Sequence, residues 1–459
     1  MALFASLLSV LVLVLAAAAE VIDVDVAVIG GGGSGAYAAV KLRENFGKRI
    51  AVIEKRNQLG GHTETWYDPE TRRAFNYGVE AFTNISASTE FFAQLHVPIK
   101  ASEFGQPRTL YVDLRDGKLV NYTPPNTEAI ADAMAGYRHE WLKYADLMLP
   151  TGVNFPTGDG IPQDLLLTWR EFARKYGLEA AGPSIWDIVA VDLNTALTID
   201  VWKSYNPSGG AIQPASGDNY EIWQRAAEVL GSHVMYESQV VSAERSNDGV
   251  QLQVKNKAGD TTKINARRLL VTVAPETIDA EIFDLSDQEL AVFTSTTGNR
   301  YYTGIVSHPS LPAAEIANVA PGSIAADYLA FPSVPFQAGF NYRGNSSAGP
   351  VHRALAVVAE DTEIEDAKSL VRSSLQNLMD AGTIPAGNSS RLEFKTFEDH
   401  GFLYRRWSAA QLRDGIVAEA NALQGLRSTW YTGAFWMNNN VVMIWNTTDA
   451  ILQRMLQDI

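Results

Sequence analysis

Near the beginning of the chain, a short apolar run passes through a cluster of glycines into a helical pattern. Residues 26–29 are four consecutive apolar side chains, as in a buried strand. The amphipathic segment 34–46 has the spacing of a helix, and a second apolar run follows at residues 49–53. The pattern therefore predicts a strand, a tight turn, a helix and a second strand, which is the beginning of an α/β domain.

The turn between the first strand and the helix has the spacing of a dinucleotide-binding loop. Gly30, Gly32 and Gly35 fit G-x-G-x-x-G, and Gly33 and Ser34 lie between them. The first glycine allows the sharp turn, the second lets the backbone approach a pyrophosphate, and the third lets the helix pack closely on the strand. The helix then directs its free N–H groups at that pyrophosphate.

An acidic residue closes the second strand. Glu54 lies nineteen residues past Gly35, where a carboxylate accepts hydrogen bonds from an adenosine ribose, and Lys55 follows it directly. A glycine-rich turn in an unrelated α/β protein is the alternative interpretation. The turn by itself allows NAD as readily as FAD.

A second glycine pair follows the acidic residue. Gly60, Gly61 and His62 come a few residues past Glu54, and an Asn-Tyr-Gly segment ends at Gly78. Together with the first turn, these segments resemble the FAD-binding half of the flavin-containing amine oxidoreductase superfamily, closest to its small fungal secretory members. Many members have arginine where this chain has His62. The resemblance implies an FAD cofactor, a backbone contact of Val240 with the adenosine, and Gly78 beside the flavin ring.

The C-terminal segment carries the second part of the resemblance. Residues 428–433 have the pattern of a strand that ends at Gly433, and residues 441–456 form an apolar helix. In the resembling family such a helix begins beneath the flavin, so the N–H groups at Asn440 and Val441 are expected to stabilise negative charge on the reduced ring. Asparagine is also a good helix N-cap, and both interpretations can hold together.

The resemblance implies a Rossmann-type FAD-binding domain with a p-hydroxybenzoate hydroxylase or amine oxidase-like two-domain architecture and a mixed α+β substrate cap. A chain of 459 residues agrees with two domains. The expected FAD-binding domain comprises residues 20–110, 215–290 and 395–459, and the cap comprises 111–214 and 291–394.

The pattern in the cap region is helical first and β-rich later. Its expected elements are a hairpin (109–114 with 118–122), helices (127–149, 163–175, 184–204 and 362–381), strands (300–307, 338–342 and 354–358) and loops (309–336).

Aromatic residues are the candidates for a substrate pocket. Trp430, Tyr431, Phe435 and Trp436 lie where the resembling family lines its pocket, and such a cavity suits a flat apolar substrate. Core packing is the alternative for each of them. Phe435, Trp436 and His62 are the candidate catalytic residues, and for His62 a structural hydrogen bond is the preferred interpretation. Residues 404–406 either line the entrance of the cap or form a solvated face, and the solvated face is the preferred interpretation.

Composition narrows the function. A net charge of −15 and a pI near 5.0 argue against nucleic acid and against general binding to anionic membranes. The chain has no cysteine, which excludes disulfides, a thiolate nucleophile and a cysteine tether for flavin. Its seven histidines show no zinc-ligand spacing, so no metal is expected.

The N-terminal residues 1–19 form an uncharged apolar segment that ends in small side chains. This predicts a cleaved secretory signal peptide, a location in the secretory pathway or outside the cell, and no stable membrane anchor after cleavage; an uncleaved anchor is the alternative. N-x-S/T glycosylation sequons follow at Asn84, Asn121, Asn345, Asn388 and Asn446. The last lies in the predicted C-terminal helix and is not expected to be modified.

Together with the resemblance, these observations predict an FAD-dependent oxidoreductase that oxidises a C–N or C–C bond of a small apolar metabolite by hydride transfer to flavin N5. The resemblance implies a role in fungal secondary metabolism. The cofactor performs the chemistry, so no protein nucleophile is needed. Molecular oxygen is the expected electron acceptor, because no second dinucleotide motif is evident. One alternative is a redox-neutral FAD-dependent isomerase of an unsaturated fatty acid or similar lipid. Another is a non-catalytic flavin carrier.

Overall fold

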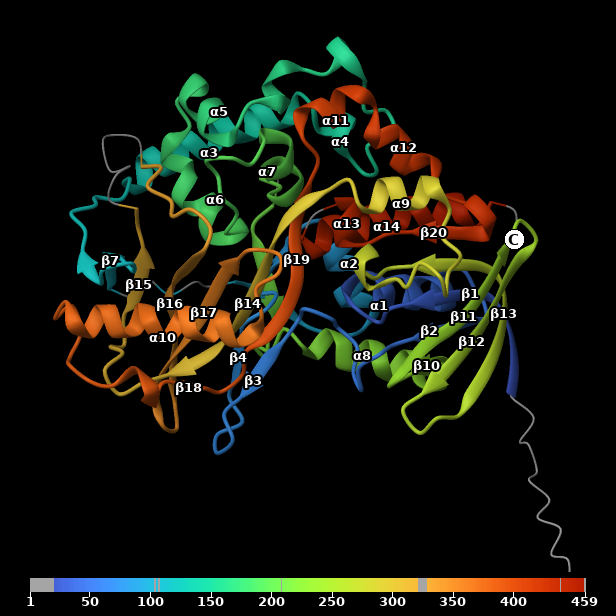
Figure 1. Ribbon diagram of the computed structural model, residues 1–459, viewed down its shortest axis with the longest axis horizontal. Coiled ribbons are helices and arrows are strands. Elements are labelled where there is room, and N and C mark those ends of the chain that lie inside the picture. The colour runs from blue at the N-terminus through green and yellow to red at the C-terminus, as the bar shows by residue number, and fades with distance from the viewer. Residues whose placement is uncertain are drawn as a thin grey trace, which may run out of the picture.

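The computed structural model describes residues 20–102, 105, 108–207, 209–320, 328–437 and 439–457. The expected signal peptide lies outside these residues. Two large sheets divide the chain into two lobes, and a block of short helices spans the top of both in Figure 1. The expected α/β fold is therefore present.

The first sheet has the strand order β10-β2-β1-β13-β12-β11, and β20 pairs with β13. Its strands are β10 (Val234–Met235), β2 (Ile50–Ile53), β1 (Glu20–Ile29), β13 (Thr261–Val271), β12 (Gly249–Asn256), β11 (Ser238–Ser246) and β20 (Thr429–Tyr431). β1 runs parallel to β2 and β13, so their carboxyl ends share one edge. That edge is where ligands bind in open α/β sheets.

Small residues bring two helices together over this edge. α1 (Gly33–Val40) consists mainly of glycine and alanine, and almost all of its residues are buried. The short side chains let α14 (Val441–Met455) pack on it, with the Trp445 ring stacked on Tyr37 at 5.1 Å. α2 (Ser86–Gln94) and α8 (Glu221–Leu230) complete this core.

The second sheet has the order β18-β14-β17-β16-β15-β7-β8, and β19 pairs with β14. α10 (Ile364–Asp380) lies across it in Figure 1, and its apolar side chains form one core with those of the sheet. The strands are β18 (Glu393–Phe394), β14 (Thr297–Ser307), β17 (Gly349–Val358), β16 (Phe336–Ser346), β15 (Glu315–Asn318), β7 (Thr109–Asp113), β8 (Lys118–Leu119) and β19 (Glu398–Arg406).

The division into two domains stays a prediction. The pairing of β19 bears on the expected domain boundary at residue 395. β19 belongs to the second sheet, although residue 395 was expected to begin the last FAD-domain segment. It runs between the two lobes in Figure 1. The expected solvated face at residues 404–406 is wrong, because Tyr404 packs against Tyr301 and the Arg405 side chain is only 8% exposed.

Three long helices expected in the cap are broken in the structure. Residues 127–149 form α3 (Thr127–Leu142) and α4 (Ala145–Met148). Residues 163–175 form a 3₁₀ turn (Gln163–Leu166) and most of α5 (Trp169–Tyr176). Residues 184–204 form most of α6 (Gly182–Val189) and α7 (Thr198–Ser204). Thr168 caps α5 from outside, and Ala190 ends α6 in a left-handed conformation. Local caps therefore override the apolar spacing.

Other elements differ from expectation in their length. The second strand of the predicted hairpin ends at Leu119, whereas β16 and β17 are longer than expected. The segment expected to be loops contains β15, and its residues 321–327 lie outside the described chain. Within the residues that the structure describes, no helix is both long and apolar enough to cross a membrane.

Candidate cofactor and substrate site

The expected dinucleotide turn connects β1 to α1. A Cβ atom on Gly35 would lie 1.8 Å from the carbonyl oxygen of Gly30, so only glycine fits there. α1 has Gly32 as its N-cap and receives no side-chain cap, which leaves the N–H groups of its first turn, including those of Gly33 and Ser34, without intrahelical partners. Such a turn can bind a phosphate through its backbone.

Glu54 is fixed at the end of β2 by the turn itself. One of its carboxylate oxygens accepts the Gly31 N–H at 2.6 Å, and the other accepts the Arg56 N–H at 2.7 Å. The buried carboxylate is thus held at the sheet edge, where it has remaining acceptor capacity for a ribose hydroxyl. Lys55, beside it, is exposed.

The second glycine pair lies directly against the first turn. Gly60 donates its N–H to the carbonyl oxygen of Gly31 at 2.9 Å, and a Cβ atom on Gly61 would be 3.0 Å from the Cα atom of Gly32. Two backbone segments distant in sequence therefore approach without side chains between them. The half-buried backbone at Gly32 and Gly61 forms a cradle that can follow an extended pyrophosphate.

The C-terminal segment closes the cradle from the other side. A Cβ atom on Gly433 would lie 2.8 Å from the carbonyl oxygen of Thr272, and Trp445 of α14 donates to the carbonyl oxygen of Gly33 at 2.8 Å. Val441 lies against the same turn, 3.0 Å from the position of a Gly33 Cβ. The structure thus brings together the two ends of the chain.

Asn440 serves as the N-cap of α14, as its residue type indicated. Its side-chain oxygen accepts the N–H groups of Val442 and Met443, and its amide nitrogen donates to the carbonyl oxygen of Ser204 at 3.2 Å. The N–H of Val441, at the first helical position, has no intrahelical partner. It is available to an acceptor beneath the helix.

Gly78 lies beside His62, and Val240 lies on the strand that begins beside Glu54. A Cβ atom on Gly78 would be 1.9 Å from the carbonyl oxygen of His62, so the segment expected beside the flavin lies against the glycine pair. Val240 lies on β11, the edge strand of the first sheet. β11 begins with Ser238, which donates its N–H to the carbonyl oxygen of Glu54 at 3.0 Å.

His62 stacks on a second histidine. Its ring lies 4.3 Å from that of His400, nearly parallel, and the His400 Nε2 atom is 2.8 Å from Glu64. The residue is exposed, yet desolvation by the surrounding chain, together with the charge of His400, lowers the pKa of His62 to about 3. The preferred hydrogen bond of the His62 imidazole is absent among the described residues. A neutral stacked ring takes its place.

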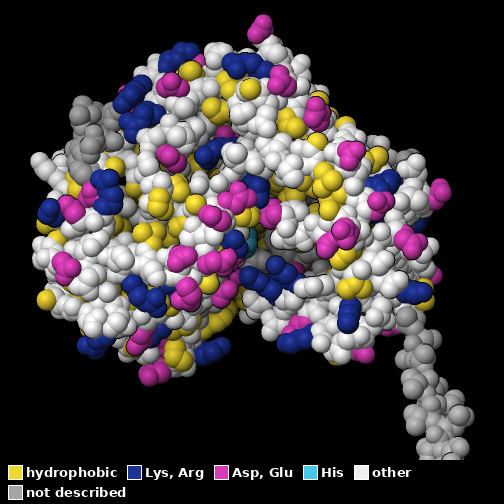
Figure 2. Space-filling view, viewed as in Figure 1, with side chains coloured by type: hydrophobic (Ala, Val, Ile, Leu, Met, Phe, Trp, Pro, Cys, Tyr) yellow, Lys and Arg dark blue, Asp and Glu magenta, His cyan; other side chains and the backbone are white. Residues whose placement is uncertain are grey.

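An open hollow adjoins this histidine pair. Figure 2 shows a depression between the lobes with acidic and basic side chains around it. Its polar lining includes Lys55, Arg56, Glu64, Tyr77 and Glu398. Desolvation alone would raise the pKa of Glu64, but hydrogen bonds from His400 and Arg56 lower it to about 2.

A cluster of charged side chains was not expected from the sequence. Glu80, two residues after Gly78, pairs with both Arg343 and Arg353. Arg353 also donates to Asn341. These partners come from strands of the second sheet that are distant in sequence, so no local residue spacing predicts the pairing. The cluster forms a polar wall close to the His62 segment.

Asp187 of α6 faces the same cluster. Its side chain is exposed, yet desolvation and the charge of Glu315 raise its pKa to about 7. Arg353 partly opposes that shift. A carboxyl group with this pKa can give or take a proton near neutral pH.

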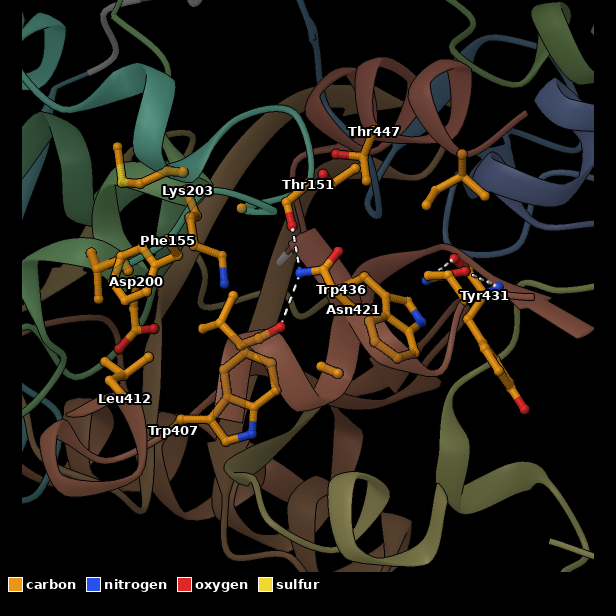
Figure 3. Close-up of a pocket in the computed structure, with 17 residues that line it drawn as sticks. Thr151, Phe155, Asp200, Lys203, Trp407, Leu412, Asn421, Tyr431, Trp436 and Thr447 are labelled. Atoms are coloured by element: carbon orange, nitrogen blue, oxygen red, sulfur yellow. Dashed lines mark hydrogen bonds between the residues drawn. The ribbon is translucent and has the colours of Figure 1, made fainter. Parts of the chain in front are cut away.

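The four aromatic residues expected to line a pocket near the C-terminus do not all face the same cavity. Tyr431 and Trp436 line a cavity between the helical block and α14, drawn in Figure 3. Trp430 points to the opposite side of β20, as successive side chains of a strand do, and packs with the first-sheet core. Phe435 of α13 (Ala434–Met437) is buried against Phe293 and is absent from the cavity wall.

Comparison with known proteins agrees with this geometry. A family model described as an NAD(P)-binding Rossmann-like domain matches residues 28–95. β-Cyclopiazonate dehydrogenase of Aspergillus flavus is 29% identical, over 91% of this chain and 90% of its own length. The FAD-dependent oxidoreductase dbaF of Emericella nidulans is 30% identical over 92% and 88%, and dpchF of Colletotrichum higginsianum is 31% identical over 89% and 88%.

Solved structures with the same fold include an isomerase and an amine oxidase. The CLA-producing fatty acid isomerase from P. acnes superposes with a TM-score of 0.71 at 14% identity, covering 94% of this chain and 98% of that one. A putrescine oxidase triple mutant gives 0.62 at 14% identity, covering 95% and 100%. At such identities the likeness concerns the fold.

Proposed function

This chain belongs to the family of fungal FAD-dependent oxidoreductases that includes β-cyclopiazonate dehydrogenase, and we propose that it binds FAD and uses it to oxidise a small apolar metabolite. The observation that carries this proposal is the side-chain-free cradle formed by three glycine segments, residues 30–35, 60–61 and 433. A pyrophosphate fits such a surface, and the carboxylate of Glu54 lies at its ribose end.

The protein's part in the reaction is to bind and orient. FAD, when bound, supplies the hydride acceptor for oxidation of a C–N or C–C bond. The N-terminus of α14 holds the Val441 N–H and its positive dipole end toward the expected ring position. His62 stays neutral against His400, so it adds no positive charge there.

We also propose O₂ as the electron acceptor and passage through the secretory pathway. The glycine cradle accounts for one dinucleotide, and the sequence carries no second motif of this kind. Four sequons, at Asn84, Asn121, Asn345 and Asn388, lie at exposed positions where glycans can attach. Asn446 lies within α14 and is half-buried. Secretion from a eukaryotic host, followed by N-terminal sequencing and glycosidase treatment, tests the location.

Reduction of bound flavin tests the catalytic proposal. Candidate metabolites are mixed anaerobically with purified protein, and the visible flavin bands are followed before and after air is admitted. An oxidase shows bleaching, then recovery with one H₂O₂ per turnover. Product formed without peroxide would instead support a redox-neutral isomerase. A protein whose flavin never bleaches with any metabolite it binds would be a carrier.

A further inference from the structure

The inner face of the second sheet, opposite the face that packs with α10, contacts both the cofactor lobe and the helical block. Thr303 of β14 donates its hydroxyl to the carbonyl oxygen of Tyr77, the residue before Gly78. Tyr301 lies two residues earlier on the strand, so its side chain is on the same face, and its hydroxyl donates to the carbonyl oxygen of Ala190 at the end of α6. The segment expected beside the flavin and the end of α6 therefore meet this face at neighbouring positions.

The charged cluster around Glu80 lies on this inner face. Arg353 of β17 is the register partner of Ile305, the next residue of β14 on the face, and of Asn341 on β16. Register partners on adjacent strands place their side chains on the same side of a sheet. Glu80 reaches Arg353 from the segment that hydrogen-bonds to the carbonyl oxygen of His62. The cluster thus lies between the sheet and the expected cofactor position.

Asp187 of α6 is the carboxyl group of this cluster that is open to a ligand. Glu80 pairs with Arg343 and Arg353, and Glu315 accepts two hydrogen bonds from β16. Asp187 forms no hydrogen bond or ion pair with any residue that the structure describes, and its side chain is exposed. A substrate group that reaches the cluster therefore finds both oxygens of Asp187 available.

The surroundings of Asp187 suit a group that exchanges a proton. Desolvation by the surrounding chain and the charge of Glu315 raise its pKa to about 7. Burial also raises the pKa of Glu315, but that carboxyl group is held by β16. The other charged or titratable side chains near Asp187 are Glu80, Tyr111, Arg343 and Arg353. Asp187 is therefore the accessible group of the cluster that can take a proton near neutral pH.

We propose that Asp187 is a catalytic residue that contacts the substrate and accepts the proton of an N–H group on the carbon that is oxidised. This role rests on the proposed oxidoreductase function. In that step the C–H bond breaks and its electron pair leaves as hydride to the flavin. The N–H bond breaks as well, its electron pair forms the new C=N bond, and the proton goes to the Asp187 carboxylate. The substrate loses two electrons in total.

The chemistry of this carboxylate selects oxidation of a C–N bond over that of a C–C bond. As hydride leaves, the N–H group becomes acidic enough for a carboxylate of near-neutral pKa to take its proton, whereas a C–H group is a much poorer proton donor. The cluster also holds three carboxyl groups against two guanidinium groups, those of Arg343 and Arg353. An anionic substrate group beside Asp187 is therefore disfavoured, and a neutral N–H donor is favoured.

Two probes of similar shape test the contact with Asp187. Binding of N-methylaniline, which has an N–H group, and N,N-dimethylaniline, which has none, is measured by ligand-detected NMR on the flavin-loaded protein. N-Methylaniline should bind the wild type up to about tenfold tighter at pH 8 than at pH 6, because the ionised fraction of Asp187 rises across this interval. N,N-Dimethylaniline should bind equally at both. Asp187→Asn should remove the pH dependence, and Asp132→Asn, from an exposed position on α3, is the matched control.

The catalytic role is tested by the rate of flavin bleaching. With a metabolite that bleaches the flavin anaerobically, the wild-type rate should rise from pH 6 to pH 8. Asp187→Asn should lower the rate by about 10²–10⁴-fold and leave it independent of pH in this range. A metabolite that bleaches the Asp187→Asn flavin at the wild-type rate would overturn the role.

Two results with the probes would also overturn the proposal. These are equal binding of the two probes to the wild type at pH 8, and an unchanged pH dependence of N-methylaniline binding in Asp187→Asn. The wild-type comparison stands even if the variant fails to fold. If no metabolite bleaches the flavin, the oxidoreductase function fails, and the probe measurements show separately whether Asp187 binds an N–H donor.

Discussion

At the scale of single residues, close backbone approach explains why the cofactor turn has its glycines, and local spacing was enough to predict them. The turn and its acidic residue lie within 25 residues of each other, so the pattern is visible along the chain. The Glu80 cluster could not be predicted in this way, because Arg343 lies 263 positions away and meets Glu80 only through the fold of the second sheet.

Gly35→Ala should prevent flavin binding. The added Cβ would meet the carbonyl oxygen of Gly30 at 1.8 Å, and neither backbone segment can move without opening the turn. Absorbance at the flavin band per mole of purified protein measures the loss, which we expect to be complete. Gly210→Ala is the matched control, because its added Cβ has no neighbour within 4 Å. Full flavin content in Gly35→Ala would contradict this account of the turn.

His62 is exposed, so solvent reduces the effect of its lowered pKa, and it should make the protein only slightly less stable as the pH falls from about 6.5 toward 3. Its pKa is lowered to about 3 in the folded state, against an ordinary value of 6.5, so in this interval the unfolded chain takes up a proton that the folded chain does not. Denaturant unfolding of wild type and His62→Gln at several pH values measures the effect. The difference in stability between the two should change across this interval. A constant difference would mean that His62 titrates normally.

At the scale of elements, the strands and helices whose ends follow from the local sequence pattern were predicted well. Those whose ends depend on contacts with neighbouring elements were not. α1, α10 and α14 follow their apolar spacing, and each packs one face on a sheet or on another helix. The cap helices were expected to be longer because their apolar residues continue past the breaks. Those residues in fact pack around loops, where N-caps such as Thr168 set the residue at which a helix begins.

A buried ion pair joins three elements of the first lobe. Glu289 of α9 (Asp287–Phe293) binds Arg245 of β11 at 2.7 Å, and both side chains are almost fully buried. Tyr431 of β20 and Arg427 donate to the same carboxylate. Glu289→Gln should destabilise the protein by about 3–5 kcal/mol, because it leaves Arg245 buried without a counter-charge. Chemical denaturation measures this, with Glu237→Gln, from an exposed pair with Lys257, as control.

The Glu289 carboxylate should make the folding stability of the protein depend on pH. Burial would raise the pKa of Glu289, but hydrogen bonds from Arg245 and Tyr431 lower it to about 2. The contribution of the Glu289 carboxylate to folding stability is therefore complete above pH 4.5, its ordinary pKa, and is lost as the pH falls toward 2. Unfolding of wild type and Glu289→Gln should accordingly converge in stability below pH 4.5. Parallel curves over that range would contradict the role of the pair.

At the scale of the whole molecule, the cofactor site joins the two ends of the described chain. Trp445 of the last helix binds the carbonyl oxygen of Gly33, so the dinucleotide turn is complete only when α14 docks. The resemblance carried by the two terminal segments was enough to predict this arrangement. The cavity in Figure 3 could not be predicted, because its wall combines residues of the helical block with α12 (Ile416–Ala422) and α14.

The most direct measurement is the identity and amount of flavin in the purified protein. Denaturation followed by chromatography should release FAD, close to one molecule per chain, and Glu54→Gln should retain less of it because the ribose loses a charged acceptor. A protein that carries no flavin and takes none up from added FAD, or that binds a nicotinamide dinucleotide in its place, would contradict the account.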